Sequence, residues 1–358
     1  MTGVTSSPPR RGTRCRRGRL RKRQADPIDA PVTAPSGRPR VATIGGGTGH
    51  YHLLTGLRLL NVETSAIVTM MDSGGSSGRL RDEYGILPPG DFTRCLIALS
   101  SHPEAMKELL GHRFVGGSLD AHTVRNVIFA ALEQITGDTV LTIERLHEVF
   151  AVEGRVIPVT LDRVELVVHL ENGRVFRGEA SIDGLADILE APVRGVALDP
   201  PAEAYPGALE ALEAADVIVI GPGDLYTSIV PNLLVTGVRG AIQRSRARVV
   251  YICNLMTKRN ETPDYTVGDF TATIERYLGA PRLDAVLFND HWPTAQVALY
   301  ASVGSRPVIP EPRQSARAGL PLVARDVLHE GRYIRHDSAK LAEELADIAG
   351  LSPLLSRA

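Results

Sequence analysis

A glycine-rich stretch, GGGTG, follows the short apolar run VATI and precedes a leucine-rich segment. Glycines let a backbone turn tightly and bring bare N–H groups close to an anion, and the positive end of a helix dipole strengthens such a site. The stretch predicts a phosphate-binding turn with the Thr48 hydroxyl as a further donor. The alternative is a tight strand–helix turn without a ligand. The residues of this turn are Gly45, Gly46, Gly47, Thr48 and Gly49.

The turn fits neither of two common phosphate-binding fingerprints. A P-loop would end in Gly-Lys-Ser/Thr, which does not occur here. The dinucleotide-binding pattern Gly-x-Gly-x-x-Gly fails because His50 occupies the third glycine position. The mismatch disfavours an NAD-dependent oxidoreductase. His50, which directly follows the turn, is a candidate ligand contact.

A second polar segment begins where the next apolar run, AIVTMM, ends at Asp72. An acidic residue in that place often meets a ribose hydroxyl or a metal ion, so Asp72 is a candidate for ligand binding, catalysis and a magnesium site. Arg79 could pair bidentately with phosphate, or it could make ordinary ion pairs on a solvated loop. The candidate ligand-binding residues of this loop are Asp72, Ser73, Gly74, Gly75 and Arg79.

A third polar loop, GPGDLYTS, follows the apolar run VIVI and adds Gly221 and Gly223 to the candidates. The carboxyl ends of parallel strands meet at one edge of a sheet, so these loops should border a common crevice. The sequence contains neither a Gly-x-Ser-x-Gly elbow nor a convincing zinc-ligand spacing. Any catalysis would therefore rest on positioning and charge stabilisation rather than on a covalent intermediate.

Composition narrows the class of protein. Aromatic residues make up only 5% of the chain, which argues against a stacking surface for single-stranded nucleic acid. No apolar run approaches the roughly 18 residues of a membrane span, and the N-terminus lacks the apolar core of a signal peptide. The three cysteines, Cys15, Cys95 and Cys253, lie far apart, which favours a reducing cytoplasm.

The N-terminal segment differs in charge from the rest of the chain. Residues 1–40 carry eleven Lys and Arg against two Asp, although the net charge of the whole protein is −1. Residues 1–39 have no apolar periodicity and are predicted to be a disordered basic tail. Such a tail either attaches electrostatically to nucleic acid or anionic lipid, or varies without a function of its own. No specific nucleic-acid partner is expected.

Residues 40–355 are predicted to form one domain with strands and helices in alternation. Around the turn Asn172-Gly173, the runs VELVVHL and VFRGEASI predict a β-hairpin inside an insertion at about 151–200. The predicted fold is α/β, Rossmann-like and doubly wound, with a mostly parallel sheet and this small hairpin insertion. Beyond the first strand–turn–helix–strand unit, Asp91 is expected to cap the start of a helix. The further elements are expected at 91–99, 123–136, 217–220, 249–255, 285–289 and 338–349.

Six motifs, in order and spacing, resemble the YvcK/CofD family over roughly residues 40–295. This family comprises the gluconeogenesis factors and the related 2-phospho-L-lactate transferases. The segments GGSSGRLR, LPPGD, GRVIPVT and CNLMT are similar to the gluconeogenesis-factor branch in particular. The six motifs are IGGGTG, VTMMDSGGSSGRLRDEYGILPPGD, GSLDAHTVRNVIFAALEQITGD, GRVIPVTL, GPGDLYTSIVPNLLV and YICNLMTKRNET.

The resemblance implies a cytoplasmic regulatory protein that binds the nucleotide sugar UDP-N-acetylglucosamine and supports cell-wall synthesis and cell shape. The alternative it implies is a transferase of the 2-phospho-L-lactate type, acting with Mg²⁺ on a nucleoside diphosphate-linked donor. It further suggests a homo-oligomer, and it adds Asn126 and Asn254 to the ligand-binding candidates. His122 is a candidate general acid or base, or else a buried hydrogen-bonded histidine.

The chain departs from the family pattern within these motifs. Ser73 stands where the family has a second aspartate, which weakens the case for metal-assisted transfer because a hard oxygen ligand is lost. Arg94 and Arg125 stand at polar or small positions of the family pattern. These arginines could bind phosphate, or they could mark a changed ligand.

Overall fold

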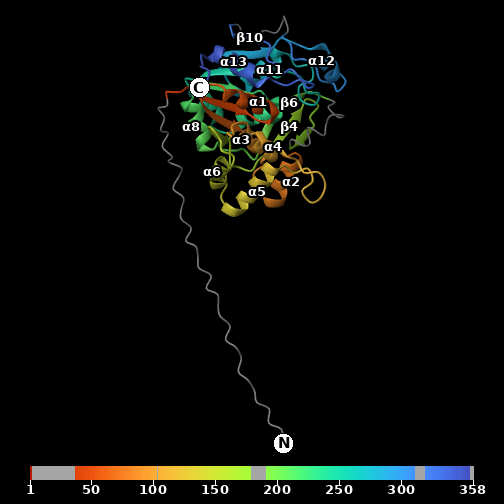
Figure 1. Ribbon diagram of the computed structural model, residues 1–358. Coiled ribbons are helices and arrows are strands. Elements are labelled where there is room, and N and C mark those ends of the chain that lie inside the picture. The colour runs from red at the N-terminus through yellow and green to blue at the C-terminus, as the bar shows by residue number, and fades with distance from the viewer. Residues whose placement is uncertain (2–36, 103, 179–190, 311–318, 355–358) are drawn as a thin grey trace. The chain divides into compact units, whose positions relative to one another are not determined.

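In the computed structural model of the protein, seven parallel strands among the described residues form the main sheet in the order β10-β9-β8-β7-β1-β2-β3 (Figure 1). The inner strand β7 has the sequence VIVI and all its residues are buried, as expected for a parallel strand covered on both faces. The predicted α/β fold with a parallel sheet is confirmed. The strands are β1 (Arg40–Gly45), β2 (Glu63–Val68), β3 (Arg155–Pro158), β7 (Val217–Ile220), β8 (Arg248–Ile252), β9 (Ala285–Asn289) and β10 (Leu322–Arg325).

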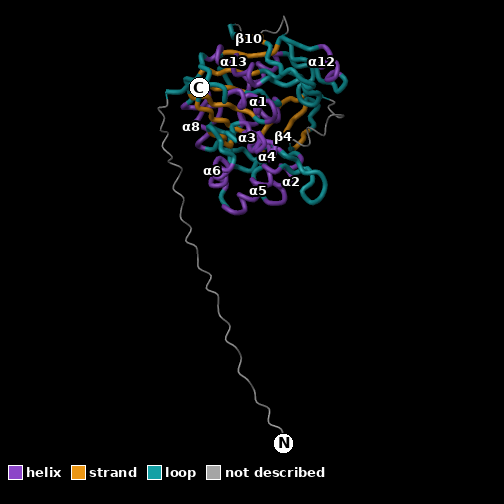
Figure 2. The backbone as a smooth tube through the Cα atoms, viewed as in Figure 1, coloured by secondary structure: helices purple, strands orange, loops and turns teal. Residues whose placement is uncertain are grey.

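Helices connect the strands and pack around the sheet, as the backbone trace shows (Figure 2). A five-residue π-helical turn, η2 (Leu225–Ile229), runs directly into α9. The helices are α1 (Gly47–Leu57), α2 (Gly75–Tyr84), α3 (Gly90–Ala98), α4 (Glu104–Gly111), α5 (Val124–Thr136), α6 (Thr139–Val149), α8 (Pro206–Ala214), α9 (Val230–Leu234), α10 (Val238–Arg244), α11 (Val267–Leu278), α12 (Thr294–Ala301) and α13 (Ser338–Ala349).

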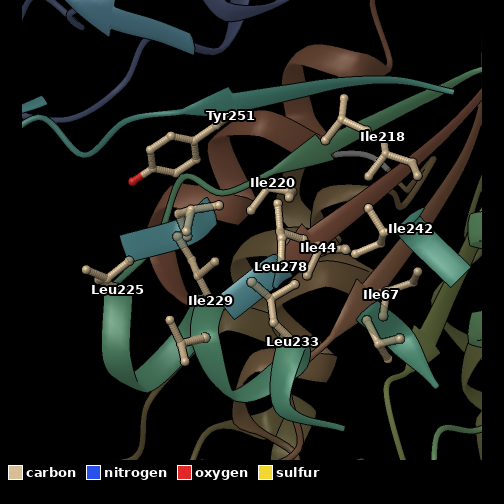
Figure 3. Close-up of a cluster of buried hydrophobic side chains, with 14 of the residues drawn as sticks. Ile44, Ile67, Ile218, Ile220, Leu225, Ile229, Leu233, Ile242, Tyr251 and Leu278 are labelled. Atoms are coloured by element: carbon tan, nitrogen blue, oxygen red, sulfur yellow. The ribbon is translucent and has the colours of Figure 1, made fainter. Parts of the chain in front are cut away.

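Two hydrophobic clusters lie on opposite faces of the main sheet, because successive side chains of a strand point to opposite sides. In β7, Ile218 and Ile220 belong to one cluster, while Val217 and Val219 belong to the other. Figure 3 shows the first cluster, in which strand isoleucines meet Leu233 and other buried side chains of the covering helices. The second cluster contains leucines of α1 and α13 and Phe92 of α3. The sheet is therefore the middle layer of three.

A small antiparallel sheet packs against the first hydrophobic cluster. Its strands, in the order β5-β4-β6, are β4 (Glu165–Leu170), β5 (Val175–Arg177) and β6 (Val193–Asp199). The predicted hairpin is confirmed, since β4 and β5 pair antiparallel around Asn172-Gly173, with Gly173 at φ +85°. Within the region predicted as an insertion, at about 151–200, β3 at 155–158 pairs with β2 in the main sheet.

The structure describes residues 1, 37–102, 104–178, 191–310 and 319–354. The chain divides into the units Met1–Gly37 and Arg38–Ala358, and all strands and helices above belong to the second unit. Nearly all of the predicted basic tail lies outside the described residues. No helix within the described part of the chain has the length and apolar composition needed to cross a membrane.

Candidate functional site

The order of strands along the chain reverses at β1. From β1 the chain continues to β2 and β3 on one side, and it later returns to β7, β8, β9 and β10 on the other. Ligands of open α/β sheets bind outside the carboxyl ends of the strands at such a reversal. The ends of β1 and β7 carry the first and third candidate loops, so both border this position.

The two loops are in backbone contact. A Cβ atom built on Gly49 would lie only 2.7 Å from the Pro222 carbonyl oxygen, and one built on Gly223 would lie 3.1 Å from the Gly46 carbonyl oxygen. Glycine at these positions lets the loops approach more closely than any side chain would allow. The structure therefore brings together the candidate glycines from residues 45–49 and 221–223.

The first loop opens helix α1 without a side-chain cap. Gly46 is extended at φ −173°, Gly47 has φ +70°, and no cap side chain bonds the first turn of α1. A Cβ on Gly46 would collide with the Asp91 carboxylate and would lie 2.8 Å from Thr69 Cγ2. An uncapped helix start made of glycines favours an anion, and the phosphate-binding turn stays a prediction.

Asp91 reaches this helix start from the first turn of α3 and accepts a hydrogen bond from the Gly47 backbone. Burial raises the pKa of its carboxyl to about 6, against the opposing effect of Arg94 at 3.6 Å. The negative charges of Asp72 and Asp224 raise this pKa further. Three aspartates, which follow β2 and β7 and lie on α3, thus interact electrostatically at this edge of the sheet.

The second candidate loop is shaped by Asp72. Its Oδ1 accepts a hydrogen bond from the Gly74 backbone at 2.8 Å, and its Oδ2 closely faces Gly90, where a Cβ would collide with it. The loop then begins α2 at Gly75, which has φ +44°. Asp72 is half-buried, so its carboxylate is fixed by the chain yet still reaches solvent.

His122 and Asn126 belong to a buried hydrogen-bond network behind this loop. Ser76 Oγ lies 2.9 Å from His122 Nδ1 and accepts from Asn126 Nδ2 at 3.2 Å. Thr93 Oγ1 donates to Asn126 Oδ1 at 2.9 Å. Burial, followed by the positive charge of Arg79, lowers the pKa of His122. The network fixes the start of α2, which gives Asn126 a positioning role beside its predicted contact with the ligand.

His50 lies inside the fold rather than at its surface. Its side chain is fully buried, with Nε2 2.7 Å from Thr43 Oγ1 and Nδ1 3.7 Å from Cys95 Sγ. Burial lowers the pKa of the imidazole to about 3, so the ring is neutral. The side chain at the position predicted as a ligand contact therefore ties α1 to β1 and α3.

The remaining candidates lie around the same edge. Asn254, just after β8, donates from Nδ2 to the Gly223 carbonyl oxygen at 2.7 Å. Arg79 is exposed on α2 and donates to the backbone carbonyl of Asp120. Within the described ranges, no three His, Cys, Asp or Glu side chains are grouped so that they alone could hold a metal ion. A magnesium ion at Asp72 would need ligand oxygens in addition.

Comparison with known protein families shows to which family the chain belongs. The sequence model described as 2-phospho-L-lactate transferase CofD matches residues 41–328. The chain belongs to the CofD family. Among its relatives, the gluconeogenesis factor of Bacillus subtilis is 37% identical over 315 residues, covering 87% of this chain and 98% of that protein. A relative from Thermotoga maritima is 40% identical over 316 residues, covering 87% and 99%.

A solved structure from this family agrees with the fold. The crystal structure of a UPF0052 family member from Bacillus halodurans superposes with a TM-score of 0.81 at 37% identity, over 86% of this chain and 98% of that one. The architecture described above is therefore that of a CofD family member.

Sequence reasoning did not single out four charged residues near these loops of the CofD family member, namely Asp91, Asp224, Lys258 and Glu261. Asp91 was expected only to cap a helix, and Asp224 was passed over although it follows a glycine turn. Lys258 bridges Asp224 at 2.8 Å and Glu261 at 2.7 Å. The place of Asp91 and Asp224 in the sequence could have identified them, because each directly follows a glycine at the carboxyl edge of the sheet.

Proposed function

We propose that this CofD family member is a cytoplasmic regulatory protein that binds a nucleotide sugar, with UDP-N-acetylglucosamine as its ligand. In this role it supports cell-wall synthesis and cell shape. The observation that carries the proposal is the contact between the loops of Gly49 and Pro222 at the strand reversal. Two glycine loops and an uncapped helix start there suit the two phosphates of a nucleotide diphosphate.

The identity of the relatives supports a regulatory role. The Bacillus subtilis and Halalkalibacterium halodurans proteins are named gluconeogenesis factors, and they are 37% and 38% identical to this chain. The network around Ser76 also engages His122 Nδ1 and both ends of the Asn126 amide within the protein. Hydrogen bonds within the protein thus hold these side chains, and the side chains shape the loop. This arrangement suits a site that binds a ligand.

The proposal is tested by isothermal titration of the full chain with UDP-N-acetylglucosamine, with and without magnesium. We expect a micromolar dissociation constant, about −8 kcal/mol, and no loss of ligand during prolonged incubation. GDP and UDP-glucose serve as comparison ligands. Absence of heat with UDP-N-acetylglucosamine, together with clear binding of GDP, would contradict the proposed ligand.

A transferase of the 2-phospho-L-lactate type is the second candidate, and Asp91 is the observation that favours it. Its pKa of about 6 lies close to neutrality, as a general base requires, and the carboxyl adjoins the phosphate-binding turn. This alternative predicts release of a nucleoside mono- or diphosphate when magnesium and an acceptor are supplied. Release that disappears in Asp91→Asn would favour the enzyme over the regulatory protein.

A further inference from the structure

Three arginines lie on or between α3, α4 and α5, helices that lie next to one another (Figure 1). Arg94 on α3 points its Nη1 toward Thr48 Oγ1 in the first turn of α1, at 3.5 Å. Arg113, between α4 and α5, is held by its bond to the Ala121 carbonyl at 2.6 Å. Both lie close enough to Arg125 of α5 to lower the pKa of its guanidinium.

Arg125 is buried and has no ion-pair partner among the described residues. It is only 8% exposed, its Nε is buried with no hydrogen-bond partner, and no ion pair links its guanidinium to the residues that the structure describes. Burial, followed by the charges of Arg94 and Arg113, lowers its pKa to about 10, so it remains charged at neutral pH. A buried charge without a partner destabilises a protein, and so it calls for a compensating anion.

The start of α5 holds a second buried polar atom without a partner. Thr123 occupies the N-cap position, is 1% exposed and makes no capping bond, and its Oγ1 has no hydrogen-bond partner in the described chain. Arg125 lies two positions further, in the first turn of this 13-residue helix. A hydroxyl and a guanidinium thus belong to the same helix start, where the positive end of the helix dipole lies.

The local charge balance leaves the arginines with unused donors. The carboxylate that opposes Arg94 and Arg125 is Asp91, which lies 3.6 Å from Arg94, longer than the roughly 2.7–2.9 Å of a strong charge-assisted bond. Guanidinium groups present planar forks of N–H donors that match the oxygens of a phosphate. The geometry therefore suits a dianionic phosphate group.

We propose that Arg94, Arg113 and Arg125, together with the start of α5, form a phosphate-binding subsite next to the glycine turn at Thr48. The inference rests on the proposed function, because it extends the nucleotide-sugar crevice along α1. The phosphate belongs either to the nucleotide ligand or to a second phosphorylated molecule bound beside it. Arg125 is then a binding residue whose stabilising partner arrives with the ligand.

The experiment measures the melting temperature of the full chain during titration with inorganic phosphate, against sodium chloride of equal ionic strength. Variants Arg94→Met and Arg125→Met remove the charge but keep an unbranched apolar stem. Arg145→Met on α6 is the matched control, because Arg145 is an exposed arginine in an ion pair with Glu148 at 2.8 Å. We expect phosphate to raise the melting temperature of the wild type and of Arg145→Met. In Arg94→Met and Arg125→Met the apparent affinity should fall at least about tenfold.

A second readout separates binding from a structural role. Without phosphate, Arg125→Met should melt at a higher temperature than the wild type, since an unpartnered buried charge has been removed. A lower melting temperature would assign Arg125 a structural role and overturn the proposal. Equal phosphate stabilisation in all four proteins, or none in the wild type, would overturn it as well.

Repeating the titration with saturating UDP-N-acetylglucosamine identifies the source of the phosphate. If the phosphate effect persists, a second phosphorylated molecule occupies the subsite, and if it disappears, the phosphate belongs to the nucleotide ligand. Failure of UDP-N-acetylglucosamine to bind would contradict the proposed function alone. The phosphate titration of the unliganded variants would still test the subsite.

Discussion

The side-chain amide of Asn254 donates a hydrogen bond to the backbone carbonyl of Gly223, with 2.7 Å between Nδ2 and O. Asn254 follows β8 and Gly223 follows β7, so this bond joins the carboxyl ends of two neighbouring strands. The other end of the amide, Oδ1, is buried and has no hydrogen-bond partner among the described residues. Asn254 therefore fixes the third candidate loop and leaves one buried acceptor unpaired.

Replacing Asn254 by alanine should weaken nucleotide-sugar binding. Loss of the bond to Gly223 frees the loop, and the free acceptor is lost with it. We expect about a tenfold rise in the dissociation constant for UDP-N-acetylglucosamine and a loss of about 1 kcal/mol in the free energy of unfolding. Asn172→Ala in the small hairpin is the matched control and should leave the affinity unchanged. An unaltered affinity in Asn254→Ala would remove this residue from the site.

A substitution at Gly49 tests the contact between the loops of residues 45–49 and 221–223. Alanine normally stabilises a helix relative to glycine, by about 1 kcal/mol. In Gly49→Ala, however, the new methyl group would lie 2.7 Å from the Pro222 carbonyl oxygen, part of a backbone that cannot rotate away. We expect a net loss of about 1–3 kcal/mol in urea unfolding, together with loss of ligand binding.

Gly111 provides the matched control for Gly49. It also lies in a helix, α4, and a Cβ built on it would have no atom within 4 Å. Gly111→Ala should leave stability unchanged or raise it slightly. Equal stability of Gly49→Ala and Gly111→Ala would mean that the loops are not in tight contact.

Much of the fold was predictable because its signals are local. The apolar runs of β7 and β9 gave both strands with their correct ends, and α13 was found at its observed bounds. The glycine loops could be placed at one sheet edge because parallel strands share their direction. β3 was missed, since a four-residue strand, RVIP, inside a region of hairpin character has no pattern of its own.

The side-chain arrangement of the site was less predictable because it depends on long-range packing. Asp91 looked like a helix cap, yet the way α3 packs on α1 brings its carboxylate to the Gly47 backbone. His50 follows the turn as a ligand contact would, but Thr43 on β1 gives its ring a buried partner. No spacing of residues in the sequence could reveal either the contact of Asp91 with Gly47 or that of His50 with Thr43.

Lys258 should be important for stability because Glu261 depends on it. The Glu261 carboxylate is 1% exposed and accepts hydrogen bonds from the Tyr226 backbone, Thr227 Oγ1 and Lys258 Nζ. Lys258→Met leaves that charge buried without its cation and should cost about 3 kcal/mol in urea unfolding. The double variant Lys258→Met/Glu261→Gln should recover part of the loss, because the charge is then removed as well.

Lys340 gives the control for this prediction. It bridges Asp326 at 2.8 Å, but both side chains are substantially exposed. Exposed ion pairs contribute little, so Lys340→Met should change the free energy of unfolding by less than about 1 kcal/mol. If Lys258→Met is no more destabilising than Lys340→Met, Glu261 does not rely on its buried cation.

Two buried histidines should make the protein sensitive to acid. Burial lowers the pKa of His50 and of His336 from 6.5 to about 3. Between these pH values the unfolded chain binds protons that the native protein does not. The free energy of unfolding should therefore fall as the pH drops from about 6.5 toward 3, by about 1.4 kcal/mol per pH unit for each histidine.

Urea unfolding at several pH values between 7 and 4 measures this dependence. His50→Gln keeps an amide that can bond Thr43 but cannot take up a proton, so its stability should depend less steeply on pH than that of the wild type. His169→Gln, at an exposed position on β4, should retain the wild-type slope. A slope in His50→Gln as steep as that of the wild type would show that His50 is not the proton-linked group. The acid sensitivity would then have to come from His336 or from other groups, and His336→Gln would decide between them.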